Sequence, residues 1–166
     1  IGGFRRAMDL LTQDHIMNFH CVGYSEIDPK AVKTYCANYR PEQDEEVAMG
    51  DIVEFTKNPE NIENLPDFDL ITGGFPCQTF SMMGKQAGFN EDRGQMFFRI
   101  MDILMVKKPK YVLLENVKNL WNHDKGRTFN RIKHELESSE TFGFGSVIYP
   151  NSQTEVVTPQ SVNLDL

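Results

Sequence analysis

The chain has 166 residues, of which 40% are hydrophobic and 25% are charged. This length and composition predict one globular domain, without internal repeats and without an apolar run of the roughly 18 residues that a membrane span needs. The formal net charge of −7 argues against a uniformly basic surface for nucleic acid. Three cysteines at unrelated spacings (Cys21, Cys36 and Cys77) are typical of reduced thiols, so we expect neither a disulfide framework nor a metal site.

Apolar segments alternate with segments of helical pattern along the chain. Before the Cys77 segment we predict strands at 20–24, 47–49 and 68–72 and helices at 29–39 and 54–63. A long loop at 75–95 follows, and then a helix from 96 to 105 and a strand at 111–114 that is buried on both faces. The last predicted elements are a helix at 126–138 and a weaker strand at 146–149. In the helix after the loop, the apolar residues at helical spacing are expected to be core: Met96, Phe97, Ile100, Met101, Leu104 and Met105.

Strands that are continuously apolar and followed by helices indicate a parallel α/β sheet that is covered on both faces. In such sheets, ligands bind beyond the carboxyl ends of the strands. Polar or reactive residues follow four of the predicted strands, namely Glu26, Asp51, the Pro76-Cys77 pair and Glu115. The sequence therefore predicts a ligand site at this edge of the sheet.

Two acidic residues and a pair of glycines are typical of a nucleotide site. Ile1-Gly2-Gly3-Phe4 opens a helix, and Glu26 follows Gly3 by 23 residues, the spacing at which an acid accepts hydrogen bonds from ribose hydroxyls. Asp51 repeats this position on the next strand, where it would accept a hydrogen bond from an adenine amino group. Ile27 and Ile52 would form apolar walls for the base. A plain helix start and solvated loop acids remain open as alternatives.

Cys77 is the predicted nucleophile, because it lies in a loop after Gly73-Gly74-Phe75-Pro76 and not in a core strand. A thiolate is suited to attack on an electron-poor carbon, although a free cysteine is more often a small buried hydrophobe. Glu115 ends an apolar strand, so we expect it to hold a proton near neutral pH and donate it. A strand-end acid that reaches water is the alternative for Glu115, and Asn116 would orient its neighbours.

A basic block follows the Cys77 segment. Residues 84–133 hold 11 basic and 5 acidic side chains, whereas residues 1–83 hold 6 and 14, and residues 134–166 hold none and 5. Such a block is either a solvated face or a surface for phosphates. Its position beside the predicted nucleophile favours phosphates, and both readings remain open.

Two motifs in the chain resemble those of the C5 cytosine-specific DNA methyltransferase family. The segment Gly74-Phe75-Pro76-Cys77-Gln78-Thr79-Phe80-Ser81 resembles the Pro-Cys-Gln nucleophile motif, and Glu115-Asn116-Val117 resembles the Glu-Asn-Val motif. Residues 84–89 with Asp92-Arg93-Gly94 look like the mobile active-site loop of this family. The segments at residues 1–4, 25–28 and 50–52 are similar to its S-adenosylmethionine contacts, so the match runs in order from Ile1 to about Lys118.

The resemblance implies a Rossmann-like, S-adenosylmethionine-dependent methyltransferase fold, with a mostly parallel sheet and helices on both faces, incomplete at both ends. It implies methyl transfer to C5 of a flipped-out cytosine through a covalent Cys77 adduct, with Glu115 acting at N3, and S-adenosylhomocysteine as product. The implied cofactor-binding residues are Ile1, Gly3, Phe4, Glu26, Ile27, Asp51, Ile52, Gly74, Pro76 and Met96. The implied contacts to the target base or DNA are Gln78, Ser81, Lys85, Arg93 and Asn116.

The sequence also departs from the family pattern. The strand and first glycine expected before Ile1 are absent, and Val162 and Leu164 stand after Pro159-Gln160 where the family has two arginines. We therefore expect a single partial catalytic domain over residues 1–166, without a target recognition domain, acting on double-stranded DNA with a separate or missing recognition domain. Its expected location is the bacterial or phage-infected cytoplasm, or the nucleus of a eukaryote; we expect neither secretion nor membrane contact.

Three other functions remain as alternatives to an active DNA methyltransferase. The first is a truncated, non-catalytic relic that binds cofactor or DNA, and the second is a transfer RNA cytosine-5 methyltransferase of the same family. A dinucleotide-binding oxidoreductase ranks last, because neither Cys77 nor Glu115 would have a role in hydride transfer. The target DNA sequence, the biological system and the oligomeric state are left open.

Overall fold

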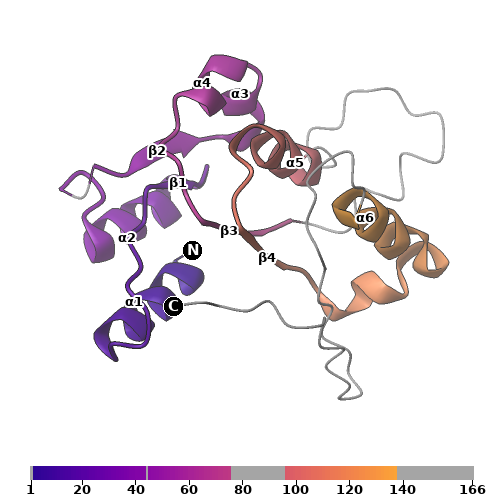
Figure 1. Cartoon of the computed structure of the whole chain (residues 1–166), viewed down its shortest axis with the longest axis horizontal. Helices are drawn as coiled ribbons and strands as arrows, with labels where there is room; N and C mark the ends of the chain where they lie inside the picture. The colour runs from indigo at the N-terminus through magenta and orange to yellow at the C-terminus, as the bar shows by residue number, and fades with distance from the viewer. Residues whose placement is uncertain (1, 44, 76–95, 138–166) are drawn as a thin grey trace. The chain divides into compact units, whose positions relative to one another are not determined.

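The computed structural model describes residues 2–43, 45–75 and 96–137 (Figure 1). The chain forms two compact units, which divide between Val117 and Lys118. The first unit contains α1 (Gly3–Gln13), β1 (Gly23–Ser25), α2 (Pro29–Tyr39), β2 (Val47–Gly50), α3 (Ile52–Thr56), α4 (Pro59–Glu63), β3 (Leu70–Gly74), α5 (Met96–Lys107) and β4 (Tyr111–Glu115). The second contains the 3-10 helices η4 (Lys118–Trp121) and η5 (His123–Gly126), followed by α6 (Arg127–Glu137). The prediction that residues 1–166 form a single partial catalytic domain stays a prediction.

The strands form two parallel pairs, β1 with β2 and β3 with β4. Helices connect the strands within each pair, α2 in the first and α5 in the second. This arrangement confirms the prediction of a mixed α/β chain with parallel strands. The strand predicted at 20–24 begins later, because β1 covers only residues 23–25, and the predicted strand at 68–72 is shifted by two residues to β3.

Local sequence signals set the bounds of several helices. The carboxylate of Asp28 caps α2 by accepting a hydrogen bond from the backbone N–H of Lys30, and Pro29 occupies the first helical turn, as predicted. The single helix predicted at 54–63 is wrong, because the structure has two short helices there. Pro59 disfavours a helical conformation at Asn58, and the Asn58 side chain instead caps α4 through the backbone N–H of Glu60.

The apolar core of the first unit lies between the helices and the strands. Ile62, Leu65 and Ile103 form a buried cluster, against which further residues of β2, α3 and β3 and of the segment before β3 pack: Val47, Met49, Ile52, Phe55, Phe68 and Ile71. Helix α5 supplies the most buried side chains, Phe97, Ile103 and Leu104. The prediction of core positions holds for Phe97, Ile100, Met101 and Leu104, whereas Met105 is 53% exposed at the edge of the helical face.

Strand β4 is covered on one face only in the part of the chain that the structure describes. Tyr111 and Leu113 are 52% and 46% exposed, while Val112 and Leu114 on the other face are half-buried. Side chains alternate between the faces of a strand, and α5 packs on the covered face, where an added Cβ on Gly73 would lie 3.5 Å from Ile100 Cδ1. The prediction that this strand is buried on both faces is therefore wrong for the described residues.

Within the described ranges, no helix is both long enough and apolar enough to cross a membrane.

Candidate active site

Glu26 and Asp51 follow two strands that end side by side. Ser25, the last residue of β1, pairs with Gly50, the last residue of β2, after a shift in register between Tyr24 and Ser25. The Ser25 hydroxyl donates a hydrogen bond of 2.7 Å to the carbonyl of Gly50. The two acids therefore lie at the same edge of one parallel strand pair, as the sequence predicts.

Each acid is held by backbone N–H groups through one carboxylate oxygen. Glu26 Oε1 accepts from Ile27 at 2.8 Å and from Asp28 at 3.0 Å. Asp51 Oδ1 accepts from Val53 at 2.8 Å and so caps α3. Both acids are half-buried. With one oxygen of each held in a turn, the second oxygen is the acceptor that a ligand hydroxyl or amino group would use.

The two isoleucines next to these acids differ in their surroundings. Ile27 is 66% exposed, which is compatible with an apolar wall for a planar ligand. Ile52 instead packs against the cluster of Ile62, Leu65 and Ile103, so part of its side chain belongs to the core. A strand-end acid followed by an isoleucine occurs at both positions, but the structure gives the two isoleucines different neighbours.

Glu115 lies beside Gly74 at the ends of β4 and β3. The two residues pair in register, and an added Cβ on Gly74 would lie 3.1 Å from Glu115 Oε2. The side-chain amide of Asn116 donates a hydrogen bond of 2.5 Å to the carbonyl of Phe75. Phe75 is buried and its ring packs against Phe97 at 5.2 Å between centroids, so the chain is firmly held just before Pro76.

Glu115 itself is exposed in the described part of the chain. The sequence predicts an acid in apolar surroundings, and this expectation is not met among the described residues. Its strand neighbour Leu113 on the same face is also exposed, since α5 packs on the opposite face. The apolar sequence of the strand therefore did not indicate the surroundings of the acid that ends it.

The predicted nucleophile Cys77 lies outside the described residues. The same holds for the predicted cofactor contacts Ile1 and Pro76 and for four of the predicted contacts to the base or DNA, Gln78, Ser81, Lys85 and Arg93. The predicted loop at 75–95 is described only at Phe75, and the predicted strand at 146–149 is also outside. Met96 is described as the first residue of α5 and is half-buried.

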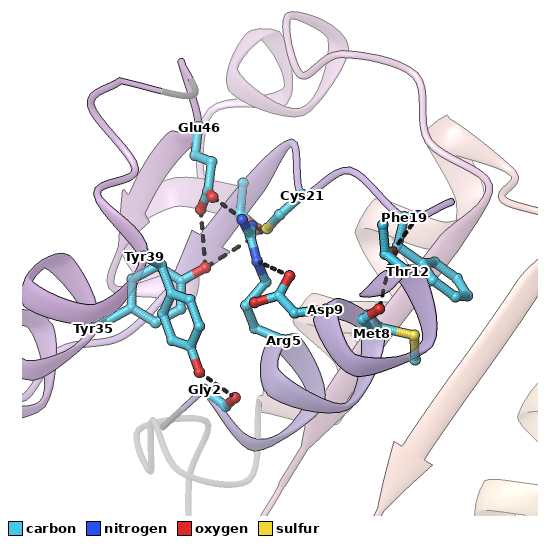
Figure 2. Close-up of polar contacts among 11 residues, drawn as sticks. Gly2, Arg5, Met8, Asp9, Thr12, Phe19, Cys21, Tyr35, Tyr39 and Glu46 are labelled. Atoms are coloured by element: carbon cyan, nitrogen blue, oxygen red, sulfur yellow. Dashed lines mark hydrogen bonds and ion pairs between the residues drawn. The ribbon is translucent and has the colours of Figure 1, made fainter. Parts of the chain in front are cut away.

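Gly3 and Phe4 lie near the opposite end of the β1–β2 pair from Glu26 and Asp51. Tyr39 is the last residue of α2. Its hydroxyl donates a hydrogen bond of 3.1 Å to the carbonyl of Gly2 (Figure 2). Gly2 has φ of +82°, and a Cβ there would lie 2.8 Å from the Tyr39 ring, so this contact requires glycine. The structure therefore does not bring the glycine turn and the two strand-end acids together.

A buried polar cluster holds α1 in this position. Arg5 pairs with Glu46 at 2.5 Å and with Asp9 at 3.0 Å, and the second oxygen of Glu46 accepts the Tyr35 hydroxyl at 2.9 Å (Figure 2). Burial, with hydrogen bonds to Cys21 and Glu46, raises the pKa of Tyr35 well above its ordinary value. Glu46 directly precedes β2, so the cluster anchors α1 at the amino end of that strand.

Ion pairs engage most of the basic side chains in the described part of the basic block. Six of the nine between residues 96 and 133 have a carboxylate partner: Arg99 with Asp102, Lys107 with Asp67, Lys110 with Asp69, Arg127 with Asp124, Arg131 with Glu135 and Lys133 with Glu137. Exposed ion pairs are weak and can exchange partners. These contacts nevertheless favour a solvated face over a dedicated phosphate surface in residues 96–133.

Comparison with known proteins identifies the family. The family model for C-5 cytosine-specific DNA methylases matches residues 1–154, nearly the whole chain. The chain belongs to this family. The match includes the two strand-end acids and the Pro76-Cys77 and Glu115-Asn116 segments, so the resemblance noted in the sequence is confirmed.

Individual members of the family are similar over most of the chain. The type II methyltransferase M.BanI of Aneurinibacillus aneurinilyticus is 40% identical over 165 residues, which cover 99% of this chain and 35% of that protein. M.HgiCI, a type II methyltransferase of Herpetosiphon aurantiacus, is 43% identical over 92% of this chain and 33% of its own length. The orphan methyltransferase M.Rho11sI of Bacillus phage rho11s is 43% identical over 78% of this chain and 24% of its own length. The chain thus spans about a quarter to a third of these relatives.

Proposed function

We propose that this chain is the cofactor-binding and nucleophile-bearing part of a DNA (cytosine-5-)-methyltransferase. The observation that carries the proposal is the meeting of Glu115 with Gly74 at the ends of β4 and β3, with Asn116 bonded to the carbonyl of Phe75. Cys77 follows Phe75 by two residues. Two residues of chain span at most about 7 Å, which supports a proposal in which Cys77 acts close to Glu115.

The residues of this strand end have the chemistry that the reaction requires. The target cytosine leaves the duplex at a cost of about a few kcal/mol in stacking and pairing. The Cys77 thiolate would then add to C6, while Glu115 would stabilise or protonate N3 and so make C5 nucleophilic. C5 would take the methyl carbon of the donor as the bond from that carbon to the sulfonium sulfur breaks, and S-adenosylhomocysteine would leave with the bonding electron pair. Loss of the C5 proton and of the N3 proton restores the double bond and expels Cys77 as thiolate.

The acids at the other strand pair fit the nucleoside of a methyl donor. S-adenosylmethionine would supply the methyl group as an electrophilic carbon. Glu26 would accept from its ribose hydroxyls and Asp51 from its adenine amino group, with the exposed Ile27 against the base. Ile52, Gly74, Pro76 and Met96 complete the proposed pocket. Ile1, Gly3 and Phe4 belong to it only if α1 lies elsewhere in the cofactor-bound protein.

The proposed fold is a Rossmann-like sheet to which both parallel pairs belong, because each pair has the strand–helix–strand connection of that fold. Double-stranded DNA is the proposed partner, with Gln78, Ser81, Lys85, Arg93 and Asn116 at the base or the backbone. A target recognition domain, outside this chain, is proposed to select the sequence. The cytoplasm of a bacterium or of a phage host is the proposed location.

A methyl-transfer assay with the full-length protein that contains this chain tests the proposal. Labelled methyl groups from S-adenosylmethionine should appear on C5 of cytosine in duplex DNA, and Cys77→Ala should abolish the transfer. Transfer to transfer RNA and not to DNA would favour the RNA enzyme. Binding of S-adenosylhomocysteine without transfer to either substrate would favour the non-catalytic relic.

A further inference from the structure

The strand ends that carry Glu26 and Asp51 are joined by a side chain in addition to the strand pairing, which is irregular at this point. Tyr24 pairs with Ala48 and Ser25 pairs with Gly50, so Met49 is the extra residue of an irregularity in β2. Such an irregularity interrupts the ladder and leaves backbone groups without their regular partners. Next to this irregularity, the Ser25 hydroxyl donates a hydrogen bond of 2.7 Å to the carbonyl of Gly50.

Gly50 is the residue at which the chain turns toward Asp51. It has φ of +64°, and an added Cβ would meet nothing within 4 Å, so its conformation and not its surroundings requires glycine. A residue without a side chain has no packing contacts to hold it. The hydrogen bond from Ser25 therefore restrains the peptide unit that directly precedes Asp51.

Ser25 also directly precedes Glu26. The Glu26 carboxylate is fixed on its own loop by the N–H groups of Ile27 and Asp28, and the Asp51 carboxylate is fixed on α3 by the N–H of Val53. Each acid is thus rigid with respect to its own strand end. The contact between Ser25 and Gly50 connects the two strand ends at the residues next to the acids.

We propose that Ser25 is a positioning residue for the nucleoside half of the cofactor, acting by setting the separation of Glu26 and Asp51. The inference rests on the proposed function, because it takes these two acids as the ribose and adenine acceptors. A ligand that bonds to both acids at once requires a fixed separation, and the loss of the Ser25 hydroxyl removes one of the restraints on Gly50 next to Asp51.

The test uses the full-length protein and calorimetry with S-adenosylhomocysteine. Ser25→Thr retains the hydroxyl, and Ser25→Val has the shape of the threonine variant without the hydroxyl. Both β-branched residues suit an exposed strand position. We expect Ser25→Val to bind about three- to tenfold more weakly than the wild type, the range of one net hydrogen bond, and Ser25→Thr to bind within about twofold. Thr34→Val is the matched control, since it removes an exposed hydroxyl-to-carbonyl bond on α2 and should leave affinity unchanged.

A double-mutant cycle separates positioning from general destabilisation. In an Asp51→Asn background, the loss of affinity caused by Ser25→Val should be smaller than in the wild type. The reason is that Ser25 is proposed to act through the contact that Asp51 makes with the ligand. Equal losses in both backgrounds, or equal affinities of the Thr and Val variants, would overturn the proposal. A wild type that does not bind S-adenosylhomocysteine would contradict the proposed function itself, and this inference with it.

Discussion

Asn116 joins the residues that follow two neighbouring strands, because its side-chain amide donates to the backbone carbonyl of Phe75. The carbonyl oxygen of the same side chain accepts the N–H of Val117 at 2.9 Å, which fixes the orientation of the amide. Glu115 precedes Asn116, and the Pro76-Cys77 segment follows Phe75. The Asn116 side chain thus links the residue that follows the proposed acid to the residue two positions before the proposed nucleophile.

Replacement of Asn116 should therefore impair turnover more than cofactor binding. Asn116→Asp has the same shape but places a carboxylate against the Phe75 carbonyl in place of a donor. We expect the turnover number of the full-length protein to fall by about 10- to 100-fold, the effect of misplacing a catalytic group, with the affinity for S-adenosylhomocysteine nearly unchanged. An Asn116→Asp protein with wild-type turnover would contradict the positioning role of this contact.

Two adjacent glycines at the end of β3 offer a matched pair of substitutions. An added Cβ at Gly74 would lie 3.1 Å from Glu115 Oε2, whereas at Gly73 it would meet Ile100 Cδ1 at 3.5 Å, an ordinary contact. Gly74→Ala should displace the Glu115 carboxylate and lower turnover about tenfold or more, while Gly73→Ala should have a small effect on turnover. Urea unfolding checks that both variants remain folded. Equal turnover in the two variants would show that the carboxylate tolerates displacement.

The buried cluster around Glu46 should contribute strongly to stability. The Glu46 side chain has no exposed area, and Glu46→Ala would leave both Arg5 and the Tyr35 hydroxyl without this acceptor. Because Arg5 is partly exposed and also pairs with Asp9, we expect a loss of about 2 kcal/mol in the free energy of unfolding. Asp9→Ala, which removes the half-buried pair with Arg5 within α1, should cost about 0.5 kcal/mol. Comparable losses for the two variants in urea unfolding would contradict the burial of Glu46.

Asp102 should make stability depend on pH in the acid range. Burial raises the pKa of Asp102, and the Arg99 guanidinium offsets part of this effect. A raised folded-state pKa stabilises the folded chain below the unfolded value, near pH 4, and this contribution is lost as the pH rises through the folded value. Asp102→Asn should therefore gain stability relative to the wild type at pH 7 and lose that advantage at pH 3. A difference that is constant between these pH values, in urea unfolding, would contradict this account.

Elements with strong local signals were predictable from the sequence. Asp28 and Pro29 indicate the start of α2. The helical spacing of apolar residues indicates the buried face of α5, which includes Phe97, Ile100, Met101 and Leu104. The break at Asn58 was missed because the apolar pattern continues across it, although Pro59 marks it. The exposure of Tyr111 and Leu113 was missed because an apolar run does not reveal how many faces are covered.

The candidate site was predictable as a set of strand ends but not as a set of contacts. Glu26 and Asp51 could be placed at one edge from order alone, since parallel strands end together. The contact between Ser25 and Gly50 depends on an irregularity in register, and the contact between Asn116 and Phe75 joins residues 41 positions apart. Neither leaves a periodic signal. The position of Gly3 away from both acids depends on the tertiary contacts of Tyr39 and Glu46 with α1.

Covalent trapping tests the central claim most directly, because it reports the bond that Cys77 is proposed to form. The full-length protein is incubated with S-adenosylmethionine and a duplex in which 5-fluorocytosine replaces the target cytosine, and adducts are detected by mass spectrometry after denaturation. Fluorine cannot leave C5 as the proton does, so the bond between Cys77 and C6 should persist and the adduct should map to Cys77. No adduct with the wild type, or an adduct that survives Cys77→Ser, would contradict the account.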